Sequence, residues 1–289
     1  MSKRNSQEAK RVARERLRLE REKQAKREKA RRQLTVAAAV VGALALIGGA
    51  GFAVSQMMKD DTSEAQKHWD DAEKVAEGEK TAGRYTSYEK PDNTAGKQGV
   101  DIVIGDKDAK NTVTIYEDMR CPVCASFEQA NGETVSKDIE DGKYKAEYVF
   151  GTFLDDAEAI AGTGSRNALS ALGAALNESP EAFMELKKIF YSKDKHPEER
   201  SDDFGDDENL IELAQGVEEL KGNKAFEKAV KNGTYDPWAV NMDKKFEAAK
   251  DVTGTPSLKV NGKKIETGQG TAPMAPQQFE QMVHGALEK

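Results

Sequence analysis

The chain has 289 residues, of which 37% are hydrophobic and 33% are charged, and its formal net charge is -7. These values are typical of a globular protein with a sizeable core rather than of a disordered chain, and they leave room for one large domain or two small ones. The charge is unevenly distributed. Residues 1–32 hold 14 Lys or Arg and five Glu, a local charge of +9, whereas the remaining chain holds 30 basic and 46 acidic residues, about -16.

The basic segment 1–33 is followed at once by an uncharged stretch of 21 residues, Leu34–Val54. A helix of this length spans roughly 30 Å, the thickness of the hydrocarbon core of a bilayer. We therefore expect a transmembrane helix over residues 34–55. A cleaved signal peptide is the alternative, although its apolar core usually has only about 7–15 residues. The basic residues before the stretch predict a single-pass protein of the cell membrane with a cytoplasmic N-terminus and an extracytoplasmic remainder. Because membrane topology explains this charge, we expect the lipid bilayer and not a nucleic acid as its partner.

Residues 56–98 are polar, with a short helix expected after Thr62 and then a segment that contains Gly, Thr, Pro and Asn. This composition predicts a stalk or linker. Its expected function is to hold the next domain away from the membrane.

Residues 99–289 have the pattern of an α/β domain. Two β-type runs come first, followed by a helix from the cysteine motif to near Gly142 and a third strand. Helical spacing of apolar residues then predicts a block of helices at about 155–250. Asn261-Gly262 predicts a two-residue hairpin, which a closing helix follows. The expected strands are Val100–Ile104, Thr112–Tyr116, Lys145–Phe150, Ser257–Val260 and Lys263–Glu266.

The only two cysteines of the chain, Cys121 and Cys124, stand in the sequence Cys-Pro-Val-Cys. A bridge between them closes too small a loop to stabilise the fold much, so a redox function explains them better. Pro122 favours the first position of a helix, which would place Cys121 at the helix N-terminus, where free backbone N–H groups stabilise a thiolate. Cys124 would lie one turn further on. We expect Cys121 to be the nucleophile and Cys124 the resolving thiol.

The surroundings of the motif leave alternatives open. Arg120 could stabilise the Cys121 thiolate by its charge, or it could be an exposed surface residue. A lone cysteine pair could also be half of a zinc or copper site, but zinc normally needs four ligands and the chain has no second pair. The three histidines, His68, His196 and His284, lack a ligand spacing, and His68 and His196 are predicted to be surface residues. We expect no metal and no cofactor.

A second motif, Gly254–Ser257 (Gly-Thr-Pro-Ser), directly precedes the expected hairpin. Together with Val103–Asp106, Tyr116–Asp118 and the cysteine motif, it resembles DsbA-like proteins of the thioredoxin superfamily. The resemblance covers about residues 100–288. It implies a thioredoxin fold with a helical insertion between the central strands, in which the second motif forms the cis-proline loop.

The resemblance also implies how such a site works. Pro256 would be cis and lie beside the cysteines, the backbone at Thr255 would hold a substrate peptide in extended form, and Pro122 and Val123 would contact that peptide. The implied activity is thiol-disulfide exchange with cysteines of exported proteins. A membrane redox partner would then restore the redox state of the cysteine pair.

Two departures from the family pattern leave the direction of electron transfer open. Many relatives carry an acidic residue six positions before the first cysteine, where this chain has Ile115; the nearby acids are Glu117 and Asp118. The dipeptide Pro-Val between the cysteines is neither the Pro-His associated with strong oxidants nor the Gly-Pro associated with reducing thioredoxins. An oxidising compartment favours an oxidase of exported proteins. A reductase or isomerase of the same fold, and a membrane-anchored binding module without enzymatic activity, are the alternatives.

Overall fold

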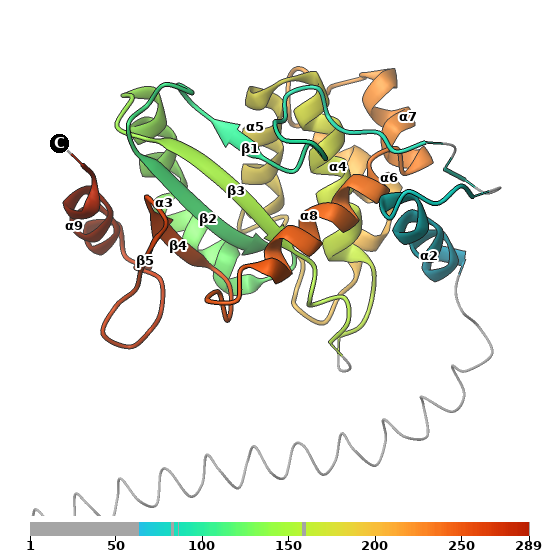
Figure 1. Ribbon diagram of the computed structural model, residues 1–289. Helices are drawn as coiled ribbons and strands as arrows, with labels where there is room; N and C mark the ends of the chain where they lie inside the picture. The colour runs from blue at the N-terminus through green and yellow to red at the C-terminus, as the bar shows by residue number, and fades with distance from the viewer. Residues whose placement is uncertain (1–63, 82–83, 86, 158–159, 289) are drawn as a thin grey trace, which may run out of the picture. The chain divides into compact units, whose positions relative to one another are not determined.

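Figure 1 shows the computed structural model of the chain, which describes residues 64–81, 84–85, 87–157 and 160–288. The chain divides into two units, Met1–Thr62 and Ser63–Lys289. The basic segment 1–33 and the transmembrane helix predicted over 34–55 lie outside the described residues. Among the helices that are described, none is both long enough and apolar enough to cross a membrane.

The second unit is built on a sheet of five strands: β1 (Ile102–Ile104), β2 (Thr112–Asp118), β3 (Lys145–Gly151), β4 (Ser257–Val260) and β5 (Lys263–Ile265). Their order in the sheet is β1-β3-β2-β4-β5 (Figure 1). β2 and β3 are parallel and end side by side, since Asp118 pairs with Gly151, whereas the other neighbouring pairs are antiparallel. All residues of β2 after its first are buried, as expected for a central strand that is covered on both faces.

The helices around this sheet are α2 (Glu64–Ala76), α3 (Pro122–Glu140), α4 (Gly164–Glu178), α5 (Pro180–Phe190), α6 (Asp207–Ala214), α7 (Lys224–Asn232), α8 (Asp236–Ala248) and α9 (Pro276–Ala286), with a 3-10 turn at Asp203–Gly205. α3 packs against α9 through the rings of Phe127 and Phe279, whose centroids are 5.9 Å apart. In Figure 1, α8 crosses in front of β3 and α3 lies behind the sheet. The helices from α4 to α8 lie between β3 and β4 in the sequence, which confirms the helical region predicted at about 155–250.

The structure corrects the stalk that was predicted over residues 56–98. In its described part, α2 packs onto the domain: Trp69 is fully buried, and its indole N–H donates a hydrogen bond to Asn167 Oδ1 at 3.2 Å. The prediction was wrong because the apolar face of α2 is narrow and stands among charged residues, so that the composition looks like that of a linker. The buried side chains of this face are Trp69, Ala72 and Val75.

Candidate active site

The cysteine motif lies where β2 leads into α3. Cys121 is the N-cap residue of α3 and Pro122 is the first residue of the helix, as expected from the sequence. The Cys121 N–H donates to the Asp118 carbonyl at 3.0 Å, and the Cys121 carbonyl accepts the first helical hydrogen bond from Ala125 at 3.1 Å. Both thiols are free; Cys121 is 7% exposed, whereas Cys124 is fully buried. A reacting partner therefore reaches Cys121 first.

The Thr255–Pro256 loop lies against Cys121. The antiparallel pairing of β4 with β2 places Ser257 opposite Tyr116, so the residues before Ser257 reach the C-terminal end of β2. The Thr255–Pro256 peptide bond is cis. Cys121 Sγ lies 3.7 Å from the Thr255 carbonyl oxygen, to which it donates a hydrogen bond when it is protonated. The two motifs that stand far apart in the sequence thus meet at one site.

The two thiols differ in their affinity for a proton. The pKa of Cys121 is lowered from 9.0 to about 6, chiefly by a hydrogen bond from the Cys124 thiol. Burial opposes the shift, whereas the side chain of Thr255 and the backbone N–H groups at the start of α3 lower the pKa further. Burial raises the pKa of Cys124 well above 9.0, and the neighbouring Cys121 raises it further. At neutral pH Cys121 is therefore mainly a thiolate and Cys124 a thiol.

A buried acid accompanies the dithiol. Glu117 is fully buried, and within the described part of the chain neither of its carboxylate oxygens has a hydrogen-bond partner. The Lys187 ammonium lies 3.4 Å from Glu117 Oε2 and donates its hydrogen bond to Glu128 at 2.6 Å. Burial raises the pKa of Glu117 from 4.5 to about 7, while Lys187 opposes this rise and Glu128 adds to it. Because charge on Glu117 also raises the pKa of Cys124, the acid and the dithiol titrate together.

The position of this acid explains one departure from the family pattern. Ile115, which stands where many relatives have an acid, is a buried core residue. Residues two apart in a strand face the same side of a sheet, so Glu117 projects on the same side as Ile115. The strand periodicity could have identified Glu117 as the replacement. Its cationic neighbour Lys187 comes from α5 in the helical insertion, and no local pattern pointed to it.

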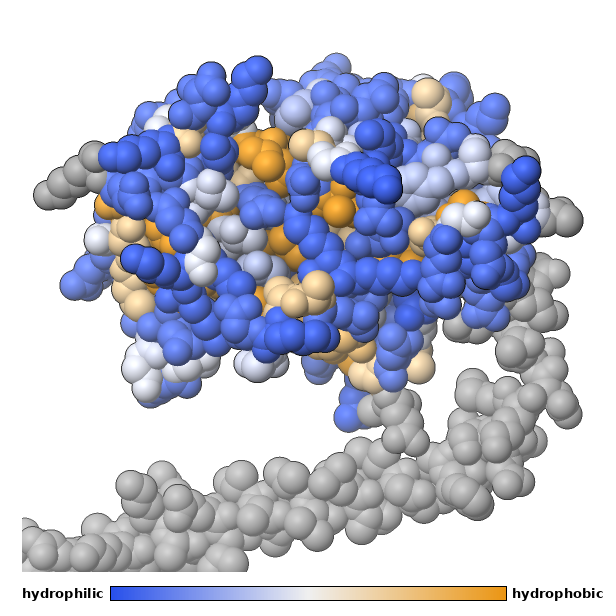
Figure 2. All heavy atoms as spheres, viewed as in Figure 1, coloured by the Kyte–Doolittle hydropathy of each residue, from blue (hydrophilic) through white to orange (hydrophobic). Residues whose placement is uncertain are grey.

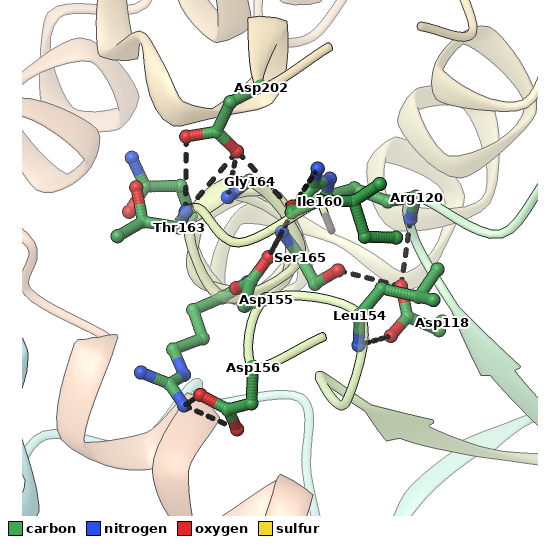
Figure 3. Close-up of polar contacts among 12 residues, drawn as sticks. Asp118, Arg120, Leu154, Asp155, Asp156, Ile160, Thr163, Gly164, Ser165 and Asp202 are labelled. Atoms are coloured by element: carbon green, nitrogen blue, oxygen red, sulfur yellow. Dashed lines mark hydrogen bonds and ion pairs between the residues drawn. The ribbon is translucent and has the colours of Figure 1, made fainter. Parts of the chain in front are cut away.

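Arg120 differs from both sequence expectations. Its side chain is 1% exposed, and it points toward the helical insertion rather than to solvent (Figure 3). Its Nη1 forms an ion pair with Asp155 Oδ1 at 3.0 Å and lies 3.6 Å from Asp202 Oδ1. Its Nη2 donates to the Ile160 carbonyl at 2.7 Å. Through this ion pair and hydrogen bond, Arg120 links the turn before Cys121 to loops of the helical insertion.

Asp118 joins the same turn to the loop that follows β3. Its carboxylate is buried: Oδ1 accepts hydrogen bonds from the Arg120 N–H at 2.9 Å and the Ser165 hydroxyl at 2.7 Å, and Oδ2 accepts one from the Leu154 N–H at 3.2 Å (Figure 3). Burial raises the pKa of Asp118 from 3.8 to about 7, against the effect of these bonds. One carboxylate therefore holds the two loops side by side. The sequence showed Asp118 only as a nearby acid.

The histidines contact other groups than the cysteine pair. Within the residues that the structure describes, no group of three or more His, Cys, Asp or Glu side chains is arranged to hold a metal ion. His196 is half-buried, with its ring near those of Tyr191 and Phe204, and is not the surface residue that was predicted. Burial lowers its pKa. His68, also only partly exposed, lies with Nε2 3.6 Å from Asp236.

Comparison with known proteins places this site in a family. A family model described as thioredoxin matches residues 97–284, which is well over half of the chain. Among solved structures, the reduced form of DsbG from Mycobacterium tuberculosis is 28% identical, with a TM-score of 0.51 over 65% of this chain and 89% of that one. Reduced DsbA from the same organism is 29% identical, with a TM-score of 0.51 over 64% of this chain and 93% of that one. BdbD from Bacillus subtilis, at 22% identity and a TM-score of 0.52, covers 68% and 95% and shares the fold.

A curated protein also matches part of the chain. The serine/threonine-protein kinase PknE of Mycobacterium tuberculosis is 23% identical over 116 residues, which are 40% of this chain and 20% of the kinase. The chain thus spans about a fifth of the length of that relative. The chain belongs to the thioredoxin family, and within it to the DsbA-like thiol-disulfide oxidoreductases.

Proposed function

We propose that this protein oxidises cysteine pairs of exported proteins on the outer side of a cell membrane. The observation that carries the proposal is the difference between its two thiols: the pKa of Cys121 is about 6, and that of Cys124 lies well above 9.0. A stabilised thiolate favours the reduced form of the dithiol. A protein whose reduced form is stabilised is the stronger oxidant.

The size of this effect can be judged at pH 7. There Cys121 lies about one pH unit above its pKa, so the thiolate stabilises the reduced form by about 1.4 kcal/mol. For a two-electron couple this energy corresponds to about 30 mV, and it grows to roughly 90 mV above pH 9. About 150 mV separate thioredoxin from DsbA, so the thiolate moves the couple toward oxidation by about a fifth of that difference at neutral pH.

The proposed reaction is a pair of thiol-disulfide exchanges. A substrate thiolate attacks Cys121 Sγ of the oxidised protein, which forms a mixed disulfide and releases the Cys124 thiolate, and this thiolate takes up a proton. A second substrate thiolate then attacks the substrate sulfur of the mixed disulfide and releases the Cys121 thiolate. Two electrons pass from the substrate to the protein. In the reverse direction Cys121 is the nucleophile and Cys124 resolves the mixed disulfide.

The surroundings of Cys121 suit an extended substrate peptide. The Thr255–Pro256 loop lies beside the sulfur, and we propose that the Thr255 backbone pairs with the peptide there. Val123 is 49% exposed, so it and Pro122 are proposed to contact the same peptide. Pro256 is buried at the base of this surface, where it is proposed to shape the loop.

The proposed location follows from the segment before the domain. The basic residues 1–33 are proposed to stay in the cytoplasm and residues 34–55 to span the membrane, which places the dithiol in an oxidising compartment. After each cycle the dithiol must give up two electrons. We propose that a membrane redox protein accepts them.

The proposal is tested by the reduction potential of the full-length protein in detergent. The protein is equilibrated in graded glutathione buffers at pH 7, and its thiols are trapped with a maleimide. An oxidase is expected to show a midpoint at or above about -200 mV, whereas a midpoint near about -270 mV would contradict the proposal and indicate a reductase.

Trapping of substrates provides a second readout. Cys124→Ala, which cannot resolve a mixed disulfide, is expected to accumulate disulfides with exported proteins in cells. Cys121→Ala serves as the control that forms none. If Cys124→Ala forms no mixed disulfides either, the protein does not exchange disulfides with proteins and the proposal fails.

A further inference from the structure

Two tyrosines are buried beside the charged groups of the active site. The face of the domain seen in Figure 2 is largely hydrophilic, whereas Tyr148 on β3 and Tyr191 at the end of α5 are at most 1% exposed. The Lys187 ammonium lies 5.0 Å from the ring centroid of Tyr148 and 5.2 Å from that of Tyr191. A buried hydroxyl is costly unless it has a hydrogen-bond partner. Within the residues that the structure describes, the Tyr148 hydroxyl has no partner, whereas that of Tyr191 has one.

The partner of Tyr191 belongs to the turn that leads to the nucleophile. The Tyr191 hydroxyl donates a hydrogen bond to the Asp118 carbonyl at 3.0 Å. The same carbonyl oxygen accepts a hydrogen bond from the Cys121 N–H at 3.0 Å. A carbonyl oxygen has two lone pairs, so these two donors occupy its full capacity. The Tyr191 hydroxyl therefore fixes the oxygen that holds the backbone of Cys121.

Tyr191 also binds the helix on the other side of the cysteine motif. Its backbone carbonyl accepts a hydrogen bond at 2.7 Å from the side-chain amide of Gln129, which lies on α3. One turn earlier on α5, the Lys187 ammonium lies 3.4 Å from Glu117 before the motif and 2.6 Å from Glu128 after it. The end of α5 thus contacts the chain on both sides of the cysteine motif.

The ionisation of Cys121 depends on how these two parts of the chain are placed. The Cys124 thiol and the backbone N–H groups at the start of α3 lower the pKa of Cys121, and a hydrogen bond requires a suitable distance and direction. We infer that Tyr191 is a positioning residue for thiol-disulfide exchange, which holds the turn before Cys121 and the start of α3 so that these donors face Cys121 Sγ. This inference deepens the proposed function and rests on its thiolate mechanism.

The Tyr191 hydroxyl remains a donor while Cys121 titrates. Burial raises the pKa of Tyr191 well above 10.0, and the negative charges of Glu117 and of the two thiolates raise it further. The hydrogen bond to the Asp118 carbonyl is therefore present on both sides of the pKa of Cys121, which is about 6.

The test is the titration of Cys121 in the reduced full-length protein, followed by the ultraviolet absorbance of the thiolate. Tyr191→Phe deletes the hydroxyl and keeps the ring. Its midpoint is expected to lie above that of the wild type by about half a pH unit to one unit, the equivalent of one hydrogen bond. Tyr148→Phe is the matched control, because it deletes a hydroxyl without a partner beside the same ammonium, and it should leave the midpoint unchanged.

A second variant applies if Tyr191→Phe does not fold. Gln129 is exposed, so Gln129→Met should fold while it removes the hydrogen bond between α3 and the Tyr191 carbonyl. Its midpoint is expected to rise in the same direction, by less than that of Tyr191→Phe.

The outcomes separate the positioning role from the proposed function. If the midpoint of folded Tyr191→Phe equals that of the wild type, or if Gln129→Met leaves it unchanged where Tyr191→Phe does not fold, the inference is wrong and the proposed function stands. An equal rise in Tyr191→Phe and Tyr148→Phe also overturns the inference, since the loss of any buried hydroxyl would then suffice. A wild-type midpoint near pH 9.0 overturns the thiolate mechanism and the inference with it. A reduction potential in the range of reductases contradicts the proposed function alone, because the shift in Tyr191→Phe does not depend on the direction of electron transfer.

Discussion

The ionisation of Cys121 depends mainly on one hydrogen bond, which the Cys124 thiol donates. We therefore expect the ultraviolet absorbance of the thiolate in the reduced protein to titrate with a midpoint near pH 6. In Cys124→Ala, which lacks the donor, the midpoint should move toward 9.0. Cys124→Ser keeps a hydroxyl donor and should lie between the two. A wild-type midpoint near 9.0 would contradict the proposed source of oxidising power.

The buried Glu117 carboxyl should make stability depend on pH. Its pKa of about 7 in the folded chain is above the ordinary 4.5, so the folded chain binds this proton more tightly than the unfolded chain. The resulting stabilisation is complete below pH 4.5 and is lost as the pH rises to about 7. Relative to Glu117→Gln, which cannot titrate, the free energy of unfolding of the reduced wild type should fall by about 3 kcal/mol over this range. Urea unfolding at several pH values measures it, and a constant difference between the two proteins would show that Glu117 does not titrate there.

For single residues, the sequence predicted those positions that depend on neighbouring residues in the chain. The position of Cys121 at the start of α3 was expected because it depends on a short motif, and the cis Thr255–Pro256 bond was expected from the family resemblance; the structure has both. The environments of Glu117 and Arg120 could not be predicted, because they depend on Lys187 and on the loops of the helical insertion, which only the tertiary fold brings near.

Among the elements, α2 departs most from its prediction. If it is part of the domain, Trp69→Ala should lower the free energy of unfolding by about 3–5 kcal/mol, since it empties a fully buried site. Trp69→Phe, which loses the hydrogen bond to Asn167 but fills much of the space, should lose less. Glu73→Ala on the exposed face of the same helix is the control and should stay within about 0.5 kcal/mol. If the free energy of unfolding is the same in Trp69→Ala as in the wild type, α2 is not part of the domain and the stalk predicted from the sequence is supported.

The bounds of the strands show how much the alternation of apolar and polar residues can predict. β4 was predicted with its observed bounds, because alternating residues end there at an Asn-Gly turn. β2 was predicted to end at Tyr116 but continues through Glu117 to Asp118. These two acids are poor strand formers. In the fold the Lys187 ammonium lies near Glu117, and Asp118 accepts hydrogen bonds from the Ser165 hydroxyl and from two backbone N–H groups.

For the whole molecule, the proposed topology makes a test in intact cells possible. If residues 1–33 are cytoplasmic and 34–55 span the membrane, a protease added outside should digest a tag at the C-terminus of intact cells. A cytoplasmic protein of the same cells is the control and should be digested only after the membrane is permeabilised. A C-terminal tag that resists the protease until permeabilisation would contradict the proposed location.

The different burial of the two thiols has a practical consequence for work on the intact chain. The protein has only two cysteines; Cys124 is fully buried, whereas Cys121 keeps 7% of its surface exposed and has a pKa of about 6. In the reduced state a small electrophile at mildly acidic pH should alkylate Cys121 alone, since Cys124 is fully buried and its pKa lies well above 9.0. A fluorophore or spin label can thus be attached at the reaction centre of the unmodified sequence, without cysteine-free variants. Such a probe would report the docking of a peptide directly. Because Cys121 is alkylated, no disulfide exchange would follow the docking.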